Sequence, residues 1–242
     1  MKLKLFHKGF NYSQDGKGNR LVYHLQGCNL SCPWCANPEG MDAEGTDTFT
    51  MTVEEICDEV VRSKPMFFDS GGVTFTGGEA TCQFTALKEI LTRLKSMGIS
   101  TALETNGTSK RLPELFSVLD ELIIDFKHYD SKKHTEIMGL GNDVIKENLK
   151  RAFEAHPNVL VRIPLIGKVN ASEQDIERFI AFFKRHHISN ARFELLCYHE
   201  YGKEKWAKCG KEYVVQDAFV SEDARIKYEN KMRMHGLNIV RT

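Results

Sequence analysis

Three cysteines lie within eight residues in the first part of the sequence, at Cys28, Cys32 and Cys35. Four thiolates complete a structural zinc site or fully ligate a 4Fe–4S cluster, but no fourth cysteine is close to this loop. Three thiolates on a four-iron cluster leave one iron open to a small molecule, which suits chemistry better than simple electron transfer. The alternative is a zinc ion whose fourth ligand is a histidine such as His24 or His199.

The other four cysteines are dispersed along the chain. Cys57 falls in an apolar pattern with helical spacing, which predicts a buried structural thiol. The pattern consists of Val53, Ile56, Val60 and Val61. Cys82, Cys197 and Cys209 are interpreted as structural too, although Cys82 and Cys197 lie close to segments with candidate site residues. Disulfides are not expected, because we expect the chain to stay in a reducing compartment.

The composition is that of an ordinary folded protein. Of the 242 residues, 41% are apolar and 27% are charged, and 33 basic residues balance 33 acidic ones. A net charge of zero gives no overall support for nucleic-acid binding. No apolar run approaches the roughly 20 residues of a membrane span, and the start of the chain lacks the apolar block of a signal peptide. We therefore expect a cytoplasmic protein that forms a single domain over residues 1–242.

Short β-branched runs alternate with amphipathic stretches along most of the chain. The runs predict six strands, at residues 21–26, 73–76, 101–104, 122–126, 159–166 and 191–196. Apolar residues with helical spacing lie between them, at 84–94, 115–119, 145–153 and 176–183. Strands that alternate with helices predict a parallel sheet with right-handed crossovers. Six units are fewer than the eight of a closed barrel, so the expected fold is α/β, a partial (β/α)6 TIM-like barrel.

Residues that could do chemistry stand at the carboxyl end of most predicted strands. The loop with the three cysteines follows the first strand. The others are Gly77, Gly78 and Glu79 after the second strand, Glu104 and Thr105 at the end of the third, Asp125 and Lys127 at the fourth, and His199 after the sixth. The carboxyl ends of parallel strands form one rim, so we expect these residues to meet there.

Two of these groups have a specific physical role and a plainer alternative. Gly77 and Gly78 let the backbone approach a ligand, and unpaired amides there could bind a carboxylate, although a glycine pair is often only a turn. Asp125 and Lys127 alternate with apolar residues, which places both on one side of a strand end. Such a pair could clamp ribose hydroxyls or a cofactor carboxylate, and a simple ion pair is the alternative.

Arg162 stands in an otherwise apolar predicted strand. A buried arginine without a partner is costly, so a carboxylate must lie beside it. That carboxylate belongs either to a cofactor-binding network or to an internal Asp or Glu.

The cysteine spacing, with Trp34 directly before the last cysteine, resembles the signature of the radical S-adenosylmethionine (SAM) superfamily. Further segments extend the resemblance along nearly the whole chain to the glycyl radical enzyme activating enzymes, especially the pyruvate formate-lyase activating type. These segments are DGKGNR at 15–20, QGC at 26–28, NPE at 37–39, SGGVT at 70–74, GGEA at 77–80, ETNG at 104–107, DFK at 125–127, VR at 161–162 and ELLCYHEYGKEKW at 194–206.

The resemblance implies one 4Fe–4S cluster on Cys28, Cys32 and Cys35, with S-adenosyl-L-methionine bound at the open iron. It implies that the reduced cluster cleaves this cofactor to methionine and a 5′-deoxyadenosyl radical. That radical would install a glycyl radical on a partner enzyme such as pyruvate formate-lyase. An electron donor such as flavodoxin or ferredoxin, anaerobic conditions and a monomer that engages its partner are further expectations.

The resemblance also implies roles for single residues around the cofactor. Glu79 resembles the residue that engages the methionine amino group, and Arg162 resembles part of the cofactor-side network. Trp34 would line the adenine side and His199 would contact the cofactor, with ordinary packing or a structural histidine as the alternatives. Glu104 with Thr105 resembles the family's monovalent cation site.

Asp15 is the candidate for a contact with the partner peptide. An activase must grip an extended peptide backbone beside its cluster, and Asp15 lies in the glycine-rich segment 15–20. The alternative is a simple turn near the start of the chain.

Three positions depart from the family pattern. Ala36 replaces a common histidine, which bears on partner contacts; Glu104 replaces an aspartate, which bears on the cation site; and Cys197 replaces a proline of the adenine-side loop. Between the loop at 27–36 and the glycine pair the chain contains only Cys57, so no auxiliary ferredoxin-like insertion is expected.

Two other functions are open at this point. One is a radical SAM enzyme that acts on a small molecule, which labelled-hydrogen transfer would distinguish. The other is a non-catalytic binding module stabilised by zinc, which metal analysis would identify.

Overall fold

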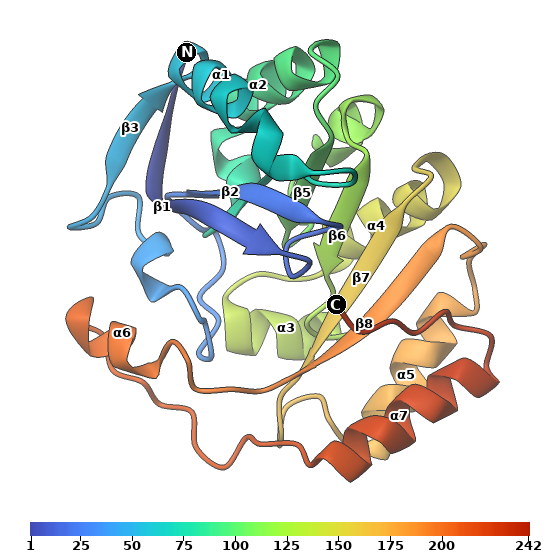
Figure 1. Ribbon diagram of the computed structural model, residues 1–242. Coiled ribbons are helices and arrows are strands. Elements are labelled where there is room, and N and C mark those ends of the chain that lie inside the picture. The colour runs from blue at the N-terminus through green and yellow to red at the C-terminus, as the bar shows by residue number, and fades with distance from the viewer.

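One sheet of eight strands forms the centre of the computed structural model, which describes residues 1–242 (Figure 1). The strands are β1 (Lys2–Tyr12), β2 (Asn19–Leu25), β3 (Phe49–Thr52), β4 (Gly72–Gly77), β5 (Thr101–Thr105), β6 (Glu121–Asp125), β7 (Val159–Leu165) and β8 (Ala191–Cys197). Their order across the sheet is β3-β1-β2-β4-β5-β6-β7-β8. β3 and β8 are therefore the outermost strands, and the barrel is not closed. The C-terminal segment adds a short parallel bridge to β8, between Ile239 and Phe193.

The parallel part of the sheet consists of β2 and β4 to β8. Each neighbouring pair in this part is parallel, and the six strands coincide with the six predicted ones. The partial (β/α)6 barrel is thus confirmed. Two further strands, β1 and β3, lie outside the prediction and extend the sheet by antiparallel pairing.

Most helices connect the strands and pack against the outer face of the sheet (Figure 1). The two short helices Ser131–Met138 and Lys203–Lys208 contact the cysteine loop instead. The α-helices are α1 (Val53–Ser63), α2 (Phe84–Ser96), α3 (Ser131–Met138), α4 (Asp143–Ala155), α5 (Glu173–Phe183), α6 (Lys203–Lys208) and α7 (Glu222–Met234). Four short 3-10 helices are η1 (Pro38–Gly40), η2 (Lys64–Phe67), η3 (Ala80–Gln83) and η4 (Leu112–Val118). No helix is both long enough and apolar enough to cross a membrane.

Three of the four predicted helical stripes lie in α-helices, namely α2, α4 and α5. The stripe at 115–119 falls in η4 instead, and Leu119 is already extended because the chain leads from there into β6. In α1, Val53, Ile56 and Val60 are buried, but Val61 is 52% exposed. The predicted stripe of α1 is therefore too wide by one residue.

The cysteines outside the loop differ in burial. Cys57 is half-buried against the main core, so it is less buried than predicted. Cys197 and Cys209 are half-buried too, but Cys82 is exposed, which does not agree with a structural thiol. All seven cysteines are free.

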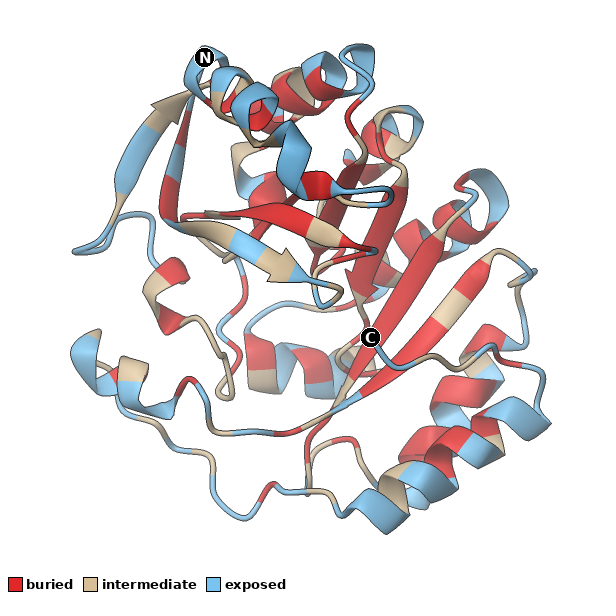
Figure 2. Cartoon of the chain, in the orientation of Figure 1, coloured by how far each residue is buried: buried red, intermediate tan, exposed pale blue.

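The two faces of the parallel sheet differ in character. Alternate residues of each strand join an apolar core of 44 residues between the sheet and the helices, as Tyr23 and Phe75 do. Because successive side chains of a strand point to opposite faces, the residues between them lie on the inner face, and many of these are polar, including Thr76, Glu104 and Arg162. Figure 2 shows the strands largely buried beneath helices whose outer surfaces are exposed.

Candidate active site

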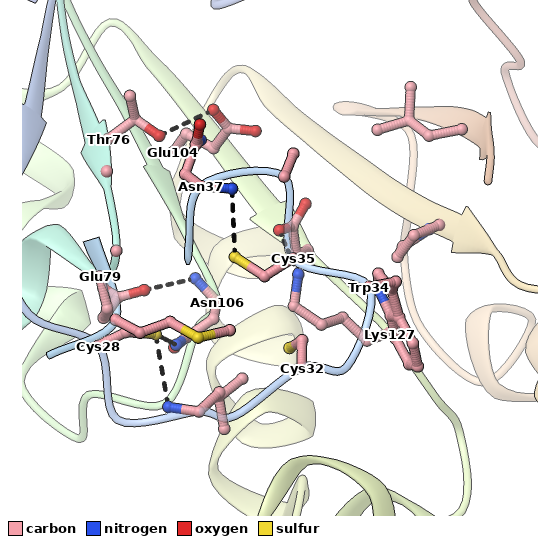
Figure 3. Close-up of a pocket in the computed structure, with 18 of the residues that line it drawn as sticks. Cys28, Cys32, Trp34, Cys35, Asn37, Thr76, Glu79, Glu104, Asn106 and Lys127 are labelled. Atoms are coloured by element: carbon pink, nitrogen blue, oxygen red, sulfur yellow. Dashed lines mark hydrogen bonds and ion pairs between the residues drawn. The ribbon is translucent and has the colours of Figure 1, made fainter. Parts of the chain in front are cut away.

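One cavity of about 230 Å³ lies at the carboxyl ends of the parallel strands (Figure 3). It brings together nearly all side chains that the sequence predicts for the site. The predicted residues that line it are Cys28, Cys32, Trp34, Cys35, Gly77, Gly78, Glu79, Glu104, Thr105, Asp125, Lys127 and His199. The three positions that depart from the family pattern, Ala36, Glu104 and Cys197, line it as well. Two predicted site residues, Asp15 and Arg162, lie outside the lining.

The cluster loop, residues 27–36, follows directly from β2 and carries the three thiols. Two of its sulfur atoms accept backbone hydrogen bonds: the N–H of Leu30 donates to Cys28 Sγ and the N–H of Asn37 donates to Cys35 Sγ, each at 3.4 Å. Donors of this kind stabilise negatively charged sulfur and tune iron–sulfur clusters. The backbone of the loop would therefore stabilise Cys28 and Cys35 as thiolate ligands.

The bare thiols are held in their protonated form. Burial raises the pKa of Cys32 to about 12 and that of Cys35 to about 11. A bound metal must replace these protons, since the thiolate is the ligand. No three His, Cys, Asp or Glu side chains converge on a point where a single metal ion could sit.

Helix α6 and the turn before it hold the cluster loop from outside. The indole N–H of Trp206 donates to the carbonyl of Cys35 at 2.9 Å, and Lys205 forms an ion pair with Glu39 at 2.7 Å. Gly202 packs so closely that a Cβ there would lie 2.7 Å from Ala36 Cα. The last part of the segment 194–206 thus supports the cluster loop, a role that the sequence analysis does not assign. In the sequence, the only indication of such a role was the length of the segment 194–206 that resembles the family.

Trp206→Phe is expected to loosen the cluster loop. The ring and most of its packing remain, but the hydrogen bond to the Cys35 carbonyl is lost, which costs about 1 kcal/mol. Iron release from the reconstituted protein to a chelator should accelerate about fivefold, since 1 kcal/mol corresponds to that factor. Release kinetics followed by absorbance measure the effect, and an unchanged rate would show that this bond does not support the loop.

The glycine pair is required by close backbone packing at the edge of the cavity. A Cβ at Gly78 would lie 2.1 Å from the carbonyl oxygen of Gly40 and 2.5 Å from that of Gly27. Gly77 has a φ of +126°, which other residues rarely adopt. The N–H of Gly78 donates to the carbonyl of Leu25 at 2.9 Å. The expectation of an unpaired amide is therefore wrong for Gly78, because the amide bonds to the strand next to it.

Glu79 joins the loops that follow β4 and β5. Its side chain is buried and accepts hydrogen bonds from the Thr105 hydroxyl at 2.7 Å, from the Asn106 N–H at 2.7 Å and from the Thr81 N–H at 3.0 Å. Thr105 therefore turns to Glu79, whereas Glu104 points to the other side of the strand. The two residues of the expected cation site engage different partners.

Arg162 lies between two carboxylates of the inner face. Its guanidinium donates to Glu104 at 2.6 Å and to Glu194 at 2.9 Å, and also to the carbonyl of Gln14. Burial raises the pKa of Glu104 to about 7, although the charge of Arg162 works in the opposite direction. The partners of Arg162 are thus internal glutamates. One of them, Glu104, also lines the cavity, so Arg162 reaches the cavity only indirectly.

Asp125 and Lys127 form an ion pair of 2.7 Å in the cavity wall. Burial opposes the charge of Lys127, but the Asp125 carboxylate raises the pKa of Lys127 above its ordinary value. The lysine therefore keeps a positive charge directly beside the cluster loop (Figure 3).

His199 and Trp34 supply flat rings to the cavity wall. The imidazole of His199 stacks on Tyr201, with ring centroids 4.2 Å apart. Burial lowers the pKa of His199, so the ring is neutral at neutral pH. Between these rings the wall is apolar, with contributions from Ile166 and Leu196.

Asp15 lies in the turn between β1 and β2, below the cavity. Its carboxylate accepts a hydrogen bond from the side chain of Asn11, and its carbonyl accepts one from the Thr74 hydroxyl at 2.6 Å. Thr74 and Arg162 belong to the inner face of the sheet, and they donate to the carbonyls of Asp15 and Gln14, so this turn lies against the inner face.

Asn106 follows Glu104 and Thr105 at the end of the third predicted strand, but the sequence analysis assigns it no role. It lines the cavity, and its amide donates to the side chain of Asn29 at 2.9 Å and lies 4.0 Å from Cys28 Sγ. Thr76, whose hydroxyl donates to Glu104 at 3.0 Å, lines the cavity as well. The signal for Asn106 was its place in the segment ETNG at 104–107.

Comparisons with known proteins agree with this site. The profile of the Radical SAM superfamily matches residues 22–182. The chain is 28% identical over 267 aligned positions to the 4-hydroxyphenylacetate decarboxylase activating enzyme of Clostridioides difficile (strain 630), covering 84% of each chain. It is 30% identical over 223 positions to the pyruvate formate-lyase-activating enzyme of Staphylococcus epidermidis (strain ATCC 12228 / FDA PCI 1200), covering 88% of each.

Solved structures give the same picture. A domain of pyruvate-formate lyase-activating enzyme from Bacteroides vulgatus ATCC 8482 matches with a TM-score of 0.59 and 28% identity, over 71% of this chain and 98% of that one. QueE from Escherichia coli, at 14% identity and a TM-score of 0.61, shares the fold over 99% of this chain and 93% of its own. The chain is therefore a member of the radical SAM superfamily and, within it, of the activating-enzyme family that includes pyruvate formate-lyase-activating enzyme.

Proposed function

We propose that the chain activates a glycyl radical enzyme. It would bind one 4Fe–4S cluster and S-adenosyl-L-methionine, receive an electron from a carrier such as flavodoxin or ferredoxin, and install a radical on a backbone glycine of its partner. The observation that carries this proposal is that one cavity brings the three loop cysteines together with the Asp125–Lys127 pair and His199. When bound, the cluster and its cofactor supply a 5′-deoxyadenosyl radical that takes a hydrogen atom from the substrate.

The cysteines would hold the cluster, and the N–H groups of Leu30 and Asn37 would stabilise two of the thiolates. Glu79 has room for one more donor. Its Oε1 accepts several hydrogen bonds, but its Oε2 accepts only that of the Asn106 N–H, and a carboxylate oxygen has two lone pairs. This capacity supports a contact between Glu79 and the methionine amino group.

The rest of the cavity matches the other parts of S-adenosylmethionine. Lys127 offers a positive charge to the methionine carboxylate, and Asp125 can accept hydrogen bonds from ribose hydroxyls. The rings of Trp34 and His199, with apolar Ile166 and Leu196, suit adenine. These residues bind and orient the cofactor and keep water from the reacting atoms.

The relatives support a protein substrate of the pyruvate formate-lyase kind. The match with the Clostridioides difficile activating enzyme spans 267 positions, more than the 242 residues of this chain, so that relative contains segments that this chain lacks. The match with the Staphylococcus epidermidis pyruvate formate-lyase-activating enzyme spans 223 positions. The compact pyruvate formate-lyase type is therefore the nearer example.

A labelled partner tests the proposal. The reconstituted protein is incubated anaerobically with a reductant, S-adenosylmethionine and a glycyl radical enzyme whose glycines carry deuterium at Cα. Deuterium is expected in 5′-deoxyadenosine, together with the doublet of a glycyl radical in the EPR spectrum. Cofactor cleavage without deuterium transfer would contradict the activase proposal and favour a small-molecule substrate. One equivalent of zinc without iron uptake would favour the binding module.

A further inference from the structure

A second hollow, of about 390 Å³, lies against the outer side of the cluster loop. Cys28, Leu30 and Met41 line both this outer hollow and the cofactor cavity. Ser31 and Pro33 line the outer hollow alone. The loop residues between and after them, Cys32, Trp34 and Cys35, line the cavity alone. The cluster loop is thus a wall one chain thick, with the cofactor cavity on one side and the outer hollow on the other.

The outer hollow is apolar inside and charged at its edge. Pro33, Trp206 and Val214 contribute apolar surface, and Val214 is 59% exposed. Lys211 and Asp42 line the same hollow and form an ion pair at 2.8 Å. An exposed apolar floor with a charged edge is typical of a surface that contacts another molecule.

The proposed reaction needs one electron from outside for each cofactor that is cleaved. Electron transfer requires a short distance between donor and cluster. The cavity side of the loop is taken by the cofactor and the substrate, so a carrier cannot approach from there. Cys28, a predicted cluster ligand, lines the outer hollow, so a molecule in the hollow would contact it directly. Trp206 lines the same hollow and donates a hydrogen bond of 2.9 Å to the Cys35 carbonyl.

We infer that the outer hollow is the docking site of a flavin-bearing electron carrier. The inference rests on the proposed function. The edge of a flavin ring system is flat and apolar, so it fits an apolar floor that borders the cluster ligand Cys28. One electron leaves the reduced flavin and the cluster gains it, so that the net charge of the cluster falls by one. No bond forms or breaks in this step.

Val214→Glu tests the inference, because it places a carboxylate on the apolar floor that a carrier would cover. The matched control is Val61→Glu, at a valine of α1 that is 52% exposed and lies outside both hollows. In the cluster-loaded protein, the Kd for flavodoxin should rise about tenfold in Val214→Glu, since a desolvated charge is costly, and stay unchanged in Val61→Glu. Reduction of the cluster by reduced flavodoxin, followed by absorbance, should slow correspondingly.

Dithionite separates this inference from the proposed function. This small reductant needs no docking site, so it should reduce the cluster of Val214→Glu at the wild-type rate. A flavodoxin Kd that does not change in Val214→Glu, or that rises equally in Val61→Glu, would overturn the docking site while leaving the activase proposal intact. Failure of the wild-type protein to take up a cluster or to cleave the cofactor with dithionite would overturn the proposed function itself.

Discussion

Replacing Cys28, Cys32 or Cys35 with alanine is expected to abolish both cluster uptake and cofactor cleavage. Each thiol borders the same cavity, and with two thiolates the cluster loses a third of its protein ligands. The wild-type protein should take up about four irons per chain and show a broad visible absorption band, which the variants should lack. Iron analysis and absorbance after anaerobic reconstitution measure the loss, and 5′-deoxyadenosine formation measures the cleavage.

Two other cysteines serve as matched controls for this experiment. Cys57 is half-buried against the core, and Cys82 is exposed in the loop region after β4. Neither lines the cavity, so alanine at either position should leave iron content and cleavage unchanged. Loss of the cluster in Cys57→Ala or Cys82→Ala would show that a fourth cysteine takes part.

Asp15→Ala is expected to keep the cluster and cofactor binding but to lose most of the glycyl radical on the partner. Asp15 lies outside the cavity, on the turn between β1 and β2, and the Thr74 hydroxyl of the inner face donates to its carbonyl. A 5′-deoxyadenosyl radical attacks many C–H bonds, so the position of the peptide decides the outcome. A loss of about 10- to 100-fold in the rate of radical formation is expected, measured by the EPR doublet.

Asp15→Asn and Asp69→Ala are the controls. Asparagine can still accept the hydrogen bond from Asn11 but has no charge, so it separates the shape of the turn from its charge. Asp69 is an exposed acidic residue near the same turn, and its loss should have no effect. An undiminished radical yield in Asp15→Ala would remove this residue from the peptide site.

The fold could be predicted where the pattern is local. The six parallel strands are short β-branched runs, and their identity depends on neighbouring residues in sequence. β1 shows the same kind of alternation. Its position in the sheet depends on antiparallel pairing with β2 on one side and β3 on the other, and a local sequence pattern does not identify these partners. Helical spacing predicted that Val61 belongs to the buried stripe of α1, but Val61 is 52% exposed. Spacing alone does not show how far the elements that pack on a helix extend around it.

The site could be predicted less completely than the fold. The need of Arg162 for a carboxylate follows from its apolar strand, but Glu104 and Glu194 are 58 and 32 residues away in sequence. The close approach of the carbonyl oxygens of Gly40 and Gly27 requires a glycine at position 78. A sequence shows that a glycine is present, and only the packed chain shows which atoms approach it.

The sequence by itself determined the three-cysteine motif of the superfamily and the strand ends that carry the other predicted site residues. These features are local: the spacing of the three cysteines, and the position of each other residue at the end of a strand, depend only on residues that are neighbours in the sequence. The tertiary structure decided which groups meet. Trp206 supports a carbonyl that lies 171 residues earlier, and Glu79 binds the loop after β5. Hydrogen bonds and ion pairs between distant segments depend on the position of every element between them, so they exist only once the whole chain has folded.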